Sequence, residues 1–282
     1  MLNWFLRKNN WRTLLSTGVI ALALITASCS NTTTSTTVTT SPKTTTTTAQ
    51  PVTLNVLAAS SLSNVLKAIN TAYTQANPNV TISLSTGASG TLQTQIENGA
   101  PSDVFLSAAI ANMDNLQKDN LIINSTRKNI VDNTLVMVVP NDSTLGLTSF
   151  NDLTLSKVTK IAIGDPKSVP AGTYAQKAFD ELGITAQIQS KFILGANVTQ
   201  VLTYVTGGNV DVGFVYSTDA LSSNQVKVVA NAPADINAQI VYPEAVIQGS
   251  QDPDVARAYL NFLSSDQAKA LFLQYGFTMA GS

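Results

Sequence analysis

The sequence contains no histidine. This absence excludes Ser-His-Asp and Cys-His nucleophile systems, and it excludes most catalytic zinc sites. Cysteine is nearly absent too: Cys29 is the only one, so no disulfide can form within the chain. With 282 residues, of which 44% are hydrophobic, the chain can bury a sizeable core without such a cross-link.

Charge is scarce and balanced. Only 12% of the residues are charged, and 16 basic residues face 17 acidic ones, for a net charge of -1. A nucleic-acid-binding protein would carry a basic stripe, and none is present. No Gly-Lys-Ser or Gly-Lys-Thr occurs, so the P-loop of nucleotide-hydrolysing enzymes is missing as well.

The first 28 residues have the pattern of a secretion signal. Arg7, Lys8 and Arg12 form a positive region, Leu14–Ile25 is apolar, and small residues follow. The uncharged run is too short to span a membrane comfortably, since about 20 apolar residues are needed. We therefore predict that residues 1–28 are a signal peptide rather than a transmembrane anchor.

Cys29 lies where a lipoprotein signal peptidase would cut. The preceding Ile25–Ser28 resembles a bacterial lipobox, with Thr26 in place of the usual leucine. This pattern predicts that Cys29 becomes a lipid-bearing N-terminus, the alternative being an incidental cysteine. Residues 29–51 are rich in Thr and Ser and have no apolar period, which favours a flexible or glycosylated tether over a packed segment. A disordered leader without a role would look the same.

From residue 52 onwards, short apolar strands alternate with segments of helical periodicity. Predicted strands lie at 52–58, 80–84, 104–107, 134–139, 161–164, 212–216, 226–230 and 240–247. Predicted helices include 61–76, 91–98, 172–182, 198–206 and 266–275, with a further helix after Asp252. The alternation predicts an α/β fold with sheets covered on both faces. The segments near 134–139 and 231–240 are candidate crossings between two lobes, and a cleft between lobes is where ligands bind.

Four junctions lead from a strand end into a helix start through small residues. They are Ala58–Leu62, Thr86–Thr91, Asp165–Gly172 and Gly195–Val198. Each would present free backbone N–H groups at a helix N-terminus, where anions bind. Ser61 could instead only cap its helix, and Ser89 could lie in an ordinary loop. Tyr216, at a strand end, could be a core residue or could direct its hydroxyl into the cleft.

Acidic residues near strand ends give little support to an enzyme or a metal site. Asp103, Asp165, Asp211 and Asp219 are dispersed along the chain, and none has metal-ligand spacing.

From about Val52 to the C-terminus, the chain resembles the molybdate-binding proteins of bacterial molybdate ABC transporters. The motifs that carry the resemblance are Ala58–Leu62, Gly87–Leu92, Gly99–Phe105, Gly164–Pro166, Val169–Ala175, Gly213–Tyr216 and Tyr275–Thr278. It implies the type II periplasmic-binding-protein fold, in which two α/β lobes close on the ligand. The implied lobes are residues 52–132 with 240–282, and residues 133–239.

The resemblance also implies a ligand site made of neutral donors. Ser61 and Ser89 would contribute hydroxyl and backbone N–H groups from the first lobe. From the second lobe, Ala171 and Val198 would contribute backbone N–H groups and Tyr216 its hydroxyl. The implied ligand is molybdate or tungstate, with no cofactor and no metal cation ligand.

The implied protein is a monomer that is held at the outer face of the cytoplasmic membrane only by its lipid and that delivers the ion to an ABC permease. Three alternatives stay open: a binding protein for another oxyanion such as sulfate, an extracellular enzyme with the same fold, and a surface adhesin suggested by the Thr-rich segment.

A site of donors alone has a consequence for selectivity. Burying a charged group is costly unless its oxygens are hydrogen-bonded, and bonds to a charged acceptor are strong. Hydrogen phosphate carries a proton that needs an acceptor, and leaving it unpaired costs on the order of 1–3 kcal/mol. We therefore expect the site to disfavour phosphate, and we expect cavity size to separate molybdate from sulfate.

Overall fold

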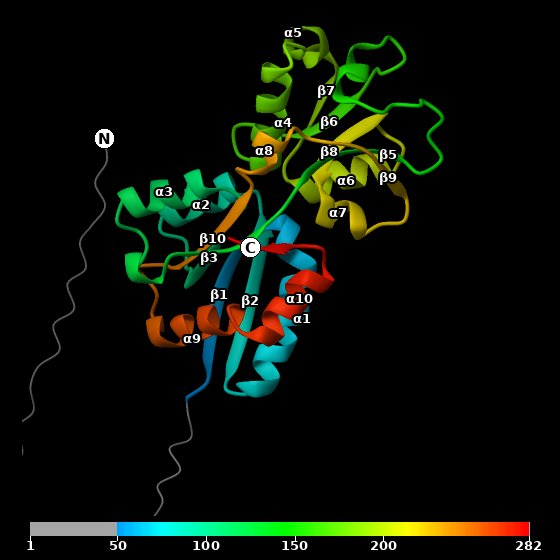
Figure 1. The fold of residues 1–282 in the computed structure, drawn as a ribbon. Coiled ribbons are helices and arrows are strands. Elements are labelled where there is room, and N and C mark those ends of the chain that lie inside the picture. The colour runs from blue at the N-terminus through cyan, green and yellow to red at the C-terminus, as the bar shows by residue number, and fades with distance from the viewer. Residues whose placement is uncertain (1–49, 282) are drawn as a thin grey trace, which may run out of the picture. The chain divides into compact units, whose positions relative to one another are not determined.

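The computed structural model describes residues 50–281, which form two sheets with their helices (Figure 1). The signal peptide at 1–28, the lipid-bearing Cys29 and most of the tether at 29–51 are predictions that lie outside the described residues. Within residues 50–281, no helix combines the length and apolar character needed to cross a membrane.

The first sheet has the strand order β11-β4-β10-β3-β1-β2. β1 is parallel to both β2 and β3, whereas β10 is antiparallel to β3 and β4. Its strands are β1 (Val52–Ala59), β2 (Val80–Gly87), β3 (Val104–Leu106), β4 (Lys128–Asp132), β10 (Val241–Val246) and β11 (Thr278–Met279). The helices around it are α1 (Ser63–Ala76), α2 (Ser89–Glu97), α3 (Ile110–Lys118), α9 (Pro253–Leu263) and α10 (Asp266–Gln274).

Alternation along β1 explains why this sheet is covered on both faces. Val56 and Ala58 belong to a core cluster with Val65 and Leu66 of α1, whereas Leu57 belongs to a separate cluster with Leu92 of α2. Successive side chains of a strand point to opposite faces, so one strand supplies both layers. Figure 1 shows α1, α9 and α10 grouped together and α2 and α3 grouped apart from them.

The second sheet has the strand order β7-β6-β8-β5-β9, with β5 antiparallel to its neighbours β8 and β9. Its strands are β5 (Leu135–Pro140), β6 (Ile161–Gly164), β7 (Phe192–Gly195), β8 (Val212–Tyr216) and β9 (Val226–Asn231). Its helices are α4 (Pro170–Glu181), α5 (Thr185–Ile188), α6 (Val198–Thr206), α7 (Ser217–Leu221) and α8 (Ala234–Asn237). Phe150, Phe179 and Phe214 pack edge-on or tilted in its core, with ring centroids 4.9 to 6.2 Å apart.

The chain passes between the sheets twice. It leaves the first sheet between β4 and β5, and it returns between β9 and β10 through the short helix α8. The first sheet thus takes its strands from residues 52–132 and 241–279, and the second from residues 135–231.

The α/β prediction with helices covering two sheets is confirmed, and most predicted strands lie within one or two residues of their observed bounds. The predicted starts of three helices are wrong by two residues: those of α2 and α4 are too late, and that of α1 is too early. α2 begins at Ser89 and α4 at Pro170, two residues earlier than expected, while the segment 60–62 forms a short 3-10 turn, η1 (Ser60–Leu62), before α1. Asp252 stands at the N-cap of α9 as predicted, but its side chain makes no capping hydrogen bond.

Candidate functional site

A small cavity lies where strand ends of the two sheets meet. Its volume is about 10 Å³, which is about that of one water-sized probe. All five residues that the sequence assigned to the ligand site line it: Ser61, Ser89, Ala171, Val198 and Tyr216. The other lining residues are Ala59, Ser60, Gly87, Ala88, Ala108, Val169 and Pro170.

The first sheet contributes two buried serines at the carboxyl ends of neighbouring parallel strands. Ser61 lies in η1, directly after β1, and Ser89 is the first residue of α2, directly after β2. The Ser89 hydroxyl oxygen accepts the backbone N–H of Ala108 at 2.9 Å. Because a hydroxyl has one proton and its oxygen is already engaged, the Ser89 proton is left to be donated elsewhere.

The second sheet contributes two helix N-termini. Ala171 is the second residue of α4, and Val198 is the first residue of α6. Backbone N–H groups in the first turn of a helix have no partner within the helix, and the helix dipole adds positive potential there. The side chain of Asn197 caps α6 by accepting the N–H of Gln200 at 2.9 Å, which fixes this helix start.

Tyr216 supplies the cavity with an unsatisfied hydroxyl. The residue ends β8, its side chain is 1% exposed, and its hydroxyl has no hydrogen-bond partner in the described structure. Burial raises the pKa of the Tyr216 phenol well above its usual value, and the nearby Tyr242, Tyr174 and Asp219 raise it further. The hydroxyl therefore keeps its proton. A buried donor without a partner is costly, and a ligand oxygen in the cavity would satisfy it.

The residues that line the cavity include no lysine, arginine, aspartate or glutamate. Asp219 lies next to this lining, and its carboxylate accepts the backbone N–H of Tyr216 at 3.1 Å. Burial raises the pKa of Asp219 to about 7, although the bond from Tyr216 lowers it. The cavity is thus a set of uncharged donors, which is the arrangement that an oxyanion without protons requires.

Each of the other three aspartates near strand ends stabilises the backbone around it by accepting a hydrogen bond. Asp103 accepts the N–H of Asn55 at 2.7 Å, Asp165 accepts that of Lys167 at 3.0 Å, and Asp211 accepts that of Thr159 at 2.6 Å. Among residues 50–281, no group of three His, Cys, Asp or Glu side chains could hold a metal ion.

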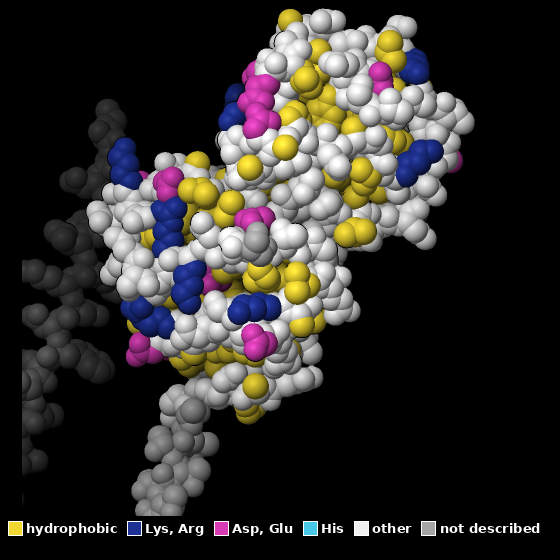
Figure 2. All heavy atoms as spheres, in the orientation of Figure 1, with side chains coloured by type: hydrophobic (Ala, Val, Ile, Leu, Met, Phe, Trp, Pro, Cys, Tyr) yellow, Lys and Arg dark blue, Asp and Glu magenta, His cyan; other side chains and the backbone are white. Residues whose placement is uncertain are grey.

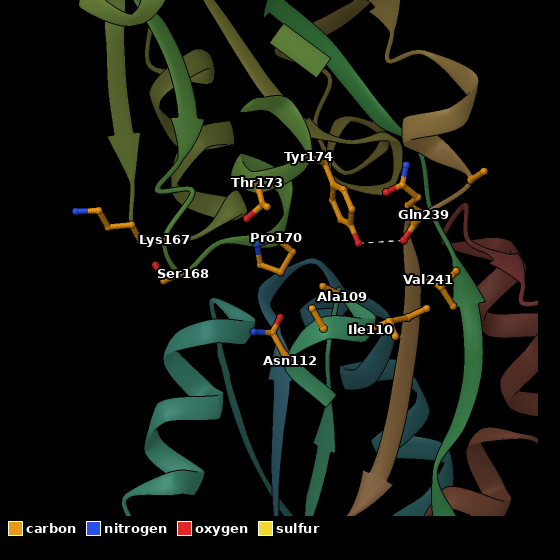
Figure 3. A pocket seen from close by; sticks show the side chains of 12 residues that line it. Ala109, Ile110, Asn112, Lys167, Ser168, Pro170, Thr173, Tyr174, Gln239 and Val241 are labelled. Atoms are coloured by element: carbon orange, nitrogen blue, oxygen red, sulfur yellow. Dashed lines mark hydrogen bonds between the residues drawn. The ribbon is translucent and has the colours of Figure 1, made fainter. Parts of the chain in front are cut away.

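Two larger hollows flank the small cavity. One, of about 530 Å³, shares Pro170 with it and is lined by both parts of the fold. Figure 3 shows Asn112 and Ala109 on one side of this hollow and Thr173 and Tyr174 on the other, where the Tyr174 hydroxyl donates to the carbonyl of Gln239 at 3.0 Å. The second, of about 710 Å³, shares Ser60 and Ser61 with the cavity. The cavity therefore lies within a longer cleft between the two sheets.

Sequence reasoning did not identify the groups that support the cavity. Tyr242 of β10 and Asn133, between β4 and β5, connect to Ser61 through hydrogen bonds, and Gly90 touches Ser168 across the cleft. Tyr242 and Ser61 are 181 positions apart, so no local pattern could indicate that they meet.

The surface carries no dense basic region on the face shown in Figure 2, where the Lys and Arg side chains are spread over the surface and several lie beside Asp or Glu side chains. This agrees with the balanced charge of the sequence.

A family model described as bacterial extracellular solute-binding protein matches residues 54–278. Among curated proteins, a Bacillus subtilis protein provisionally named ABC transporter substrate-binding lipoprotein YvgL is 40% identical over 80% of this chain and 86% of its own length. The molybdate-binding protein ModA of Haemophilus influenzae is 34% identical over 82% of this chain and 91% of its own length. The resemblance inferred from the sequence is thus confirmed.

Solved structures of binding proteins also resemble this chain. The substrate-binding domain of a provisionally assigned molybdenum ABC transporter from Clostridium difficile is 37% identical, with a TM-score of 0.62, and the match covers 80% of this chain and 98% of that one. The periplasmic molybdate-binding protein of Azotobacter vinelandii has a TM-score of 0.71 over 80% of this chain and 98% of its own. At 21% identity, the latter match supports the fold alone.

Proposed function

The chain belongs to the bacterial extracellular solute-binding proteins, and from this premise we infer that it binds molybdate or tungstate and delivers the ion to an ABC importer. The observation that carries this proposal is the cavity in which Ser61, Ser89, Ala171, Val198 and Tyr216 meet. Relatives named for molybdate binding share about a third of its residues.

Each of the five residues has a defined part in the proposal. Ser61 and Ser89 donate their hydroxyl protons, and Ala171 and Val198 donate backbone N–H groups from helix N-termini. Tyr216 donates the hydroxyl that has no partner in the described structure. Five neutral donors directed at one tetrahedral dianion would offset its loss of hydration without a counter-charge. No cofactor is needed, because the ion is cargo and undergoes no reaction.

The site draws its donors from both sheets, which suggests how the protein works. We take residues 52–132 with 240–282 as one lobe and residues 133–239 as the other. An ion held by both lobes favours the closed arrangement over an open one, so binding shifts the population towards closure. The closed form is then the one that a membrane permease would recognise. Belonging to a family of binding proteins, the chain is a receptor rather than an enzyme.

The route to the membrane is also part of the proposal. The predicted signal peptide would export the chain, and lipid on Cys29 would hold it at the outer face of the cytoplasmic membrane. The Thr/Ser-rich residues 29–51 would then be the tether, and the folded part would act as a monomer. The name of the Bacillus subtilis relative, a lipoprotein, supports this anchoring.

A panel of oxyanions tests the proposed function. Unfolding temperatures of the folded part are measured with molybdate, tungstate, sulfate and phosphate, because a tight ligand raises apparent stability. Molybdate and tungstate should give large upward shifts, and isothermal titration should show one ion per chain. Stabilisation by sulfate with none by molybdate would assign the protein to the alternative oxyanion. Phosphate binding as tight as molybdate binding would reject a donor-only site.

A further inference from the structure

The Ser61 hydroxyl is the end of a buried chain of hydrogen bonds. Its oxygen lies 2.9 Å from the hydroxyl oxygen of Tyr242, and the side-chain amide of Asn133 donates to that same Tyr242 oxygen at 3.3 Å. All three residues are buried. Distance alone leaves open which of the two hydroxyls donates to the other, but the surroundings of Asn133 decide it.

Asn133 can lie in only one orientation. Its Oδ1 lies 2.9 Å from the backbone N–H of Thr134 and 3.0 Å from the hydroxyl of Ser217. A backbone N–H can only donate, so the atom facing Thr134 must be the carbonyl oxygen. The amide nitrogen therefore faces Thr218, at 2.9 Å, and Tyr242, and it donates to both.

The fixed amide determines the direction of the next bond. The Tyr242 oxygen accepts a hydrogen bond from the Asn133 amide, and an amide nitrogen cannot accept one in return. Ser61 and Asn133 are the two partners that lie within 3.5 Å of the Tyr242 hydroxyl, and of these only Ser61 can accept a hydrogen bond from it; the Tyr216 hydroxyl, which is also nearby, is assigned to the ligand. Burial keeps the pKa of Tyr242 well above its usual value, so the proton is present throughout the physiological range.

The Ser61 oxygen thus accepts a hydrogen bond from Tyr242, and Ser61 can donate its own proton into the cavity. Ser89 is in the same situation, because its oxygen accepts the N–H of Ala108. Building on the proposed function, we propose that Asn133 and Tyr242 are positioning residues that hold Ser61 as a donor towards the ligand, and that they thereby contribute to the rejection of oxyanions that carry a proton.

The position of Asn133 in the fold fits this role. Asn133 lies where the chain crosses from the first sheet to the second, and its partners Ser217 and Thr218 directly follow Tyr216 of the cavity. The same network therefore joins a ligand residue of the first sheet to the start of α7 beside the second. The hydrogen bonds of Asn133 therefore connect the two lobes next to the site.

Tyr242→Phe removes one hydroxyl and tests the proposal directly. Affinities for molybdate and for phosphate are measured at mildly alkaline pH, where both ions are dianions but only phosphate carries a proton. Without Tyr242, Ser61 can turn its oxygen towards a ligand proton. Ser61 can still donate to molybdate but is no longer held in that direction, so molybdate affinity should fall by about tenfold or less while phosphate affinity rises. The ratio of the two affinities should thus narrow by about tenfold.

Tyr259→Phe is the matched control. Tyr259 is buried in the same part of the fold, and its hydroxyl donates to Asn70 at 2.7 Å, away from the cavity. This variant should keep the molybdate-to-phosphate ratio of the unmodified protein. A purely structural role for Tyr242 would weaken both ions by the same factor, and that result overturns the inference.

Asn133→Asp provides a second measurement. A carboxylate at this position accepts a hydrogen bond from the Tyr242 hydroxyl, which makes Ser61 donate to Tyr242 and turn its lone pairs to the cavity. The added charge repels both dianions alike, so its effect cancels in the ratio of molybdate to phosphate affinity. That ratio therefore reports the direction of the hydrogen bonds, and it should narrow again. An unchanged ratio in both variants refutes the positioning role alone. Failure of the unmodified protein to bind molybdate refutes the proposed function itself.

Discussion

The backbone N–H of Gly90 donates to the carbonyl of Ser168 at 2.9 Å, across the cleft between the two lobes. Gly90 is in the first turn of α2, next to Ser89 of the cavity, and Ser168 precedes α4, next to the segment that holds Ala171. A Cβ at position 90 would lie 2.8 Å from the Ser168 oxygen and 2.9 Å from its Cα, both backbone atoms. Only glycine lets the two lobes approach this closely.

Gly90→Ala should therefore weaken ligand binding without touching the ligand. The methyl group would hold the lobes apart, so closure on the ion would lose part of its stabilisation, and we expect molybdate to bind about tenfold more weakly. The unliganded protein should be as stable or more stable, because alanine is favoured over glycine in a helix by about 1 kcal/mol. Isothermal titration and thermal unfolding measure the two effects separately.

Gly249→Ala is the control for this variant, since a Cβ there meets no atom within 4 Å. Its affinity should equal that of the unmodified protein. If Gly90→Ala binds molybdate equally well, the contact with Ser168 does not contribute to closure.

Ser89→Ala should give one of the largest losses of affinity among single serine changes. It removes a donor from the cavity, and it leaves the buried N–H of Ala108 without its acceptor. We expect molybdate affinity to fall about tenfold to a hundredfold, since a bond to a charged group contributes roughly 1.5–3 kcal/mol. Ser102→Ala is the matched control, because Ser102 is also buried but its hydroxyl bonds to the carbonyl of Ala100. Equal affinities in the two variants would remove Ser89 from the site.

The sequence was sufficient for the α/β class because strand and helix periodicities are local signals. The short elements that it did not indicate have no such signal. β11 has two residues, α8 has four, and β4 consists of Lys128–Asp132, where only two residues are buried. These elements form because tertiary contacts hold them: β4 lies between β10 and β11 in the sheet.

The site was predictable to the extent that it lies in continuous motifs at strand ends. Ala171 and Val198 would act only through their backbone, so no side-chain chemistry marks them, and the family resemblance was needed to point to them. Tyr242 and Asn133 could not be found at all from the sequence. Tyr242 sits in an apolar strand and looks like a core residue, and its pairing with Ser61 depends on the sheet order, which is not a local property.

Tyr216→Phe should change affinity and stability in opposite directions. The Tyr216 hydroxyl is buried without a hydrogen-bond partner in the described structure, so its removal should stabilise the unliganded protein by about 1 kcal/mol. The same change removes a donor from the cavity and should weaken molybdate binding about tenfold. Tyr259→Phe, which removes a paired hydroxyl, should instead destabilise the protein and leave affinity unchanged. A loss of stability in Tyr216→Phe would show that its hydroxyl has a partner in solution.

Glu244 should make stability depend on pH. It lies in β10 with 0% exposure, and neither carboxylate oxygen has a hydrogen-bond partner in the described structure. Burial raises the pKa of Glu244 from 4.5 to about 8, although Lys128 lowers it. At a pH between these two values, Glu244 is ionised in the unfolded chain but still protonated in the folded one. The free energy of unfolding should therefore decline as the pH rises through this window, and the raised pKa of Asp219, about 7, adds to the decline.

Glu244→Gln removes the ionisation and should flatten this decline. Above the folded pKa the variant should be more stable than the unmodified protein, by up to roughly 5 kcal/mol, since the pKa rises from 4.5 to about 8 and one pKa unit corresponds to about 1.4 kcal/mol. At low pH, where the carboxyl is protonated in both states, the difference should vanish. Denaturant unfolding across the pH range measures it, with Glu181→Gln, an exposed position in α4, as the control that should follow the unmodified curve. If Glu244→Gln also follows that curve, a cation or a water must pair the carboxylate in the folded protein.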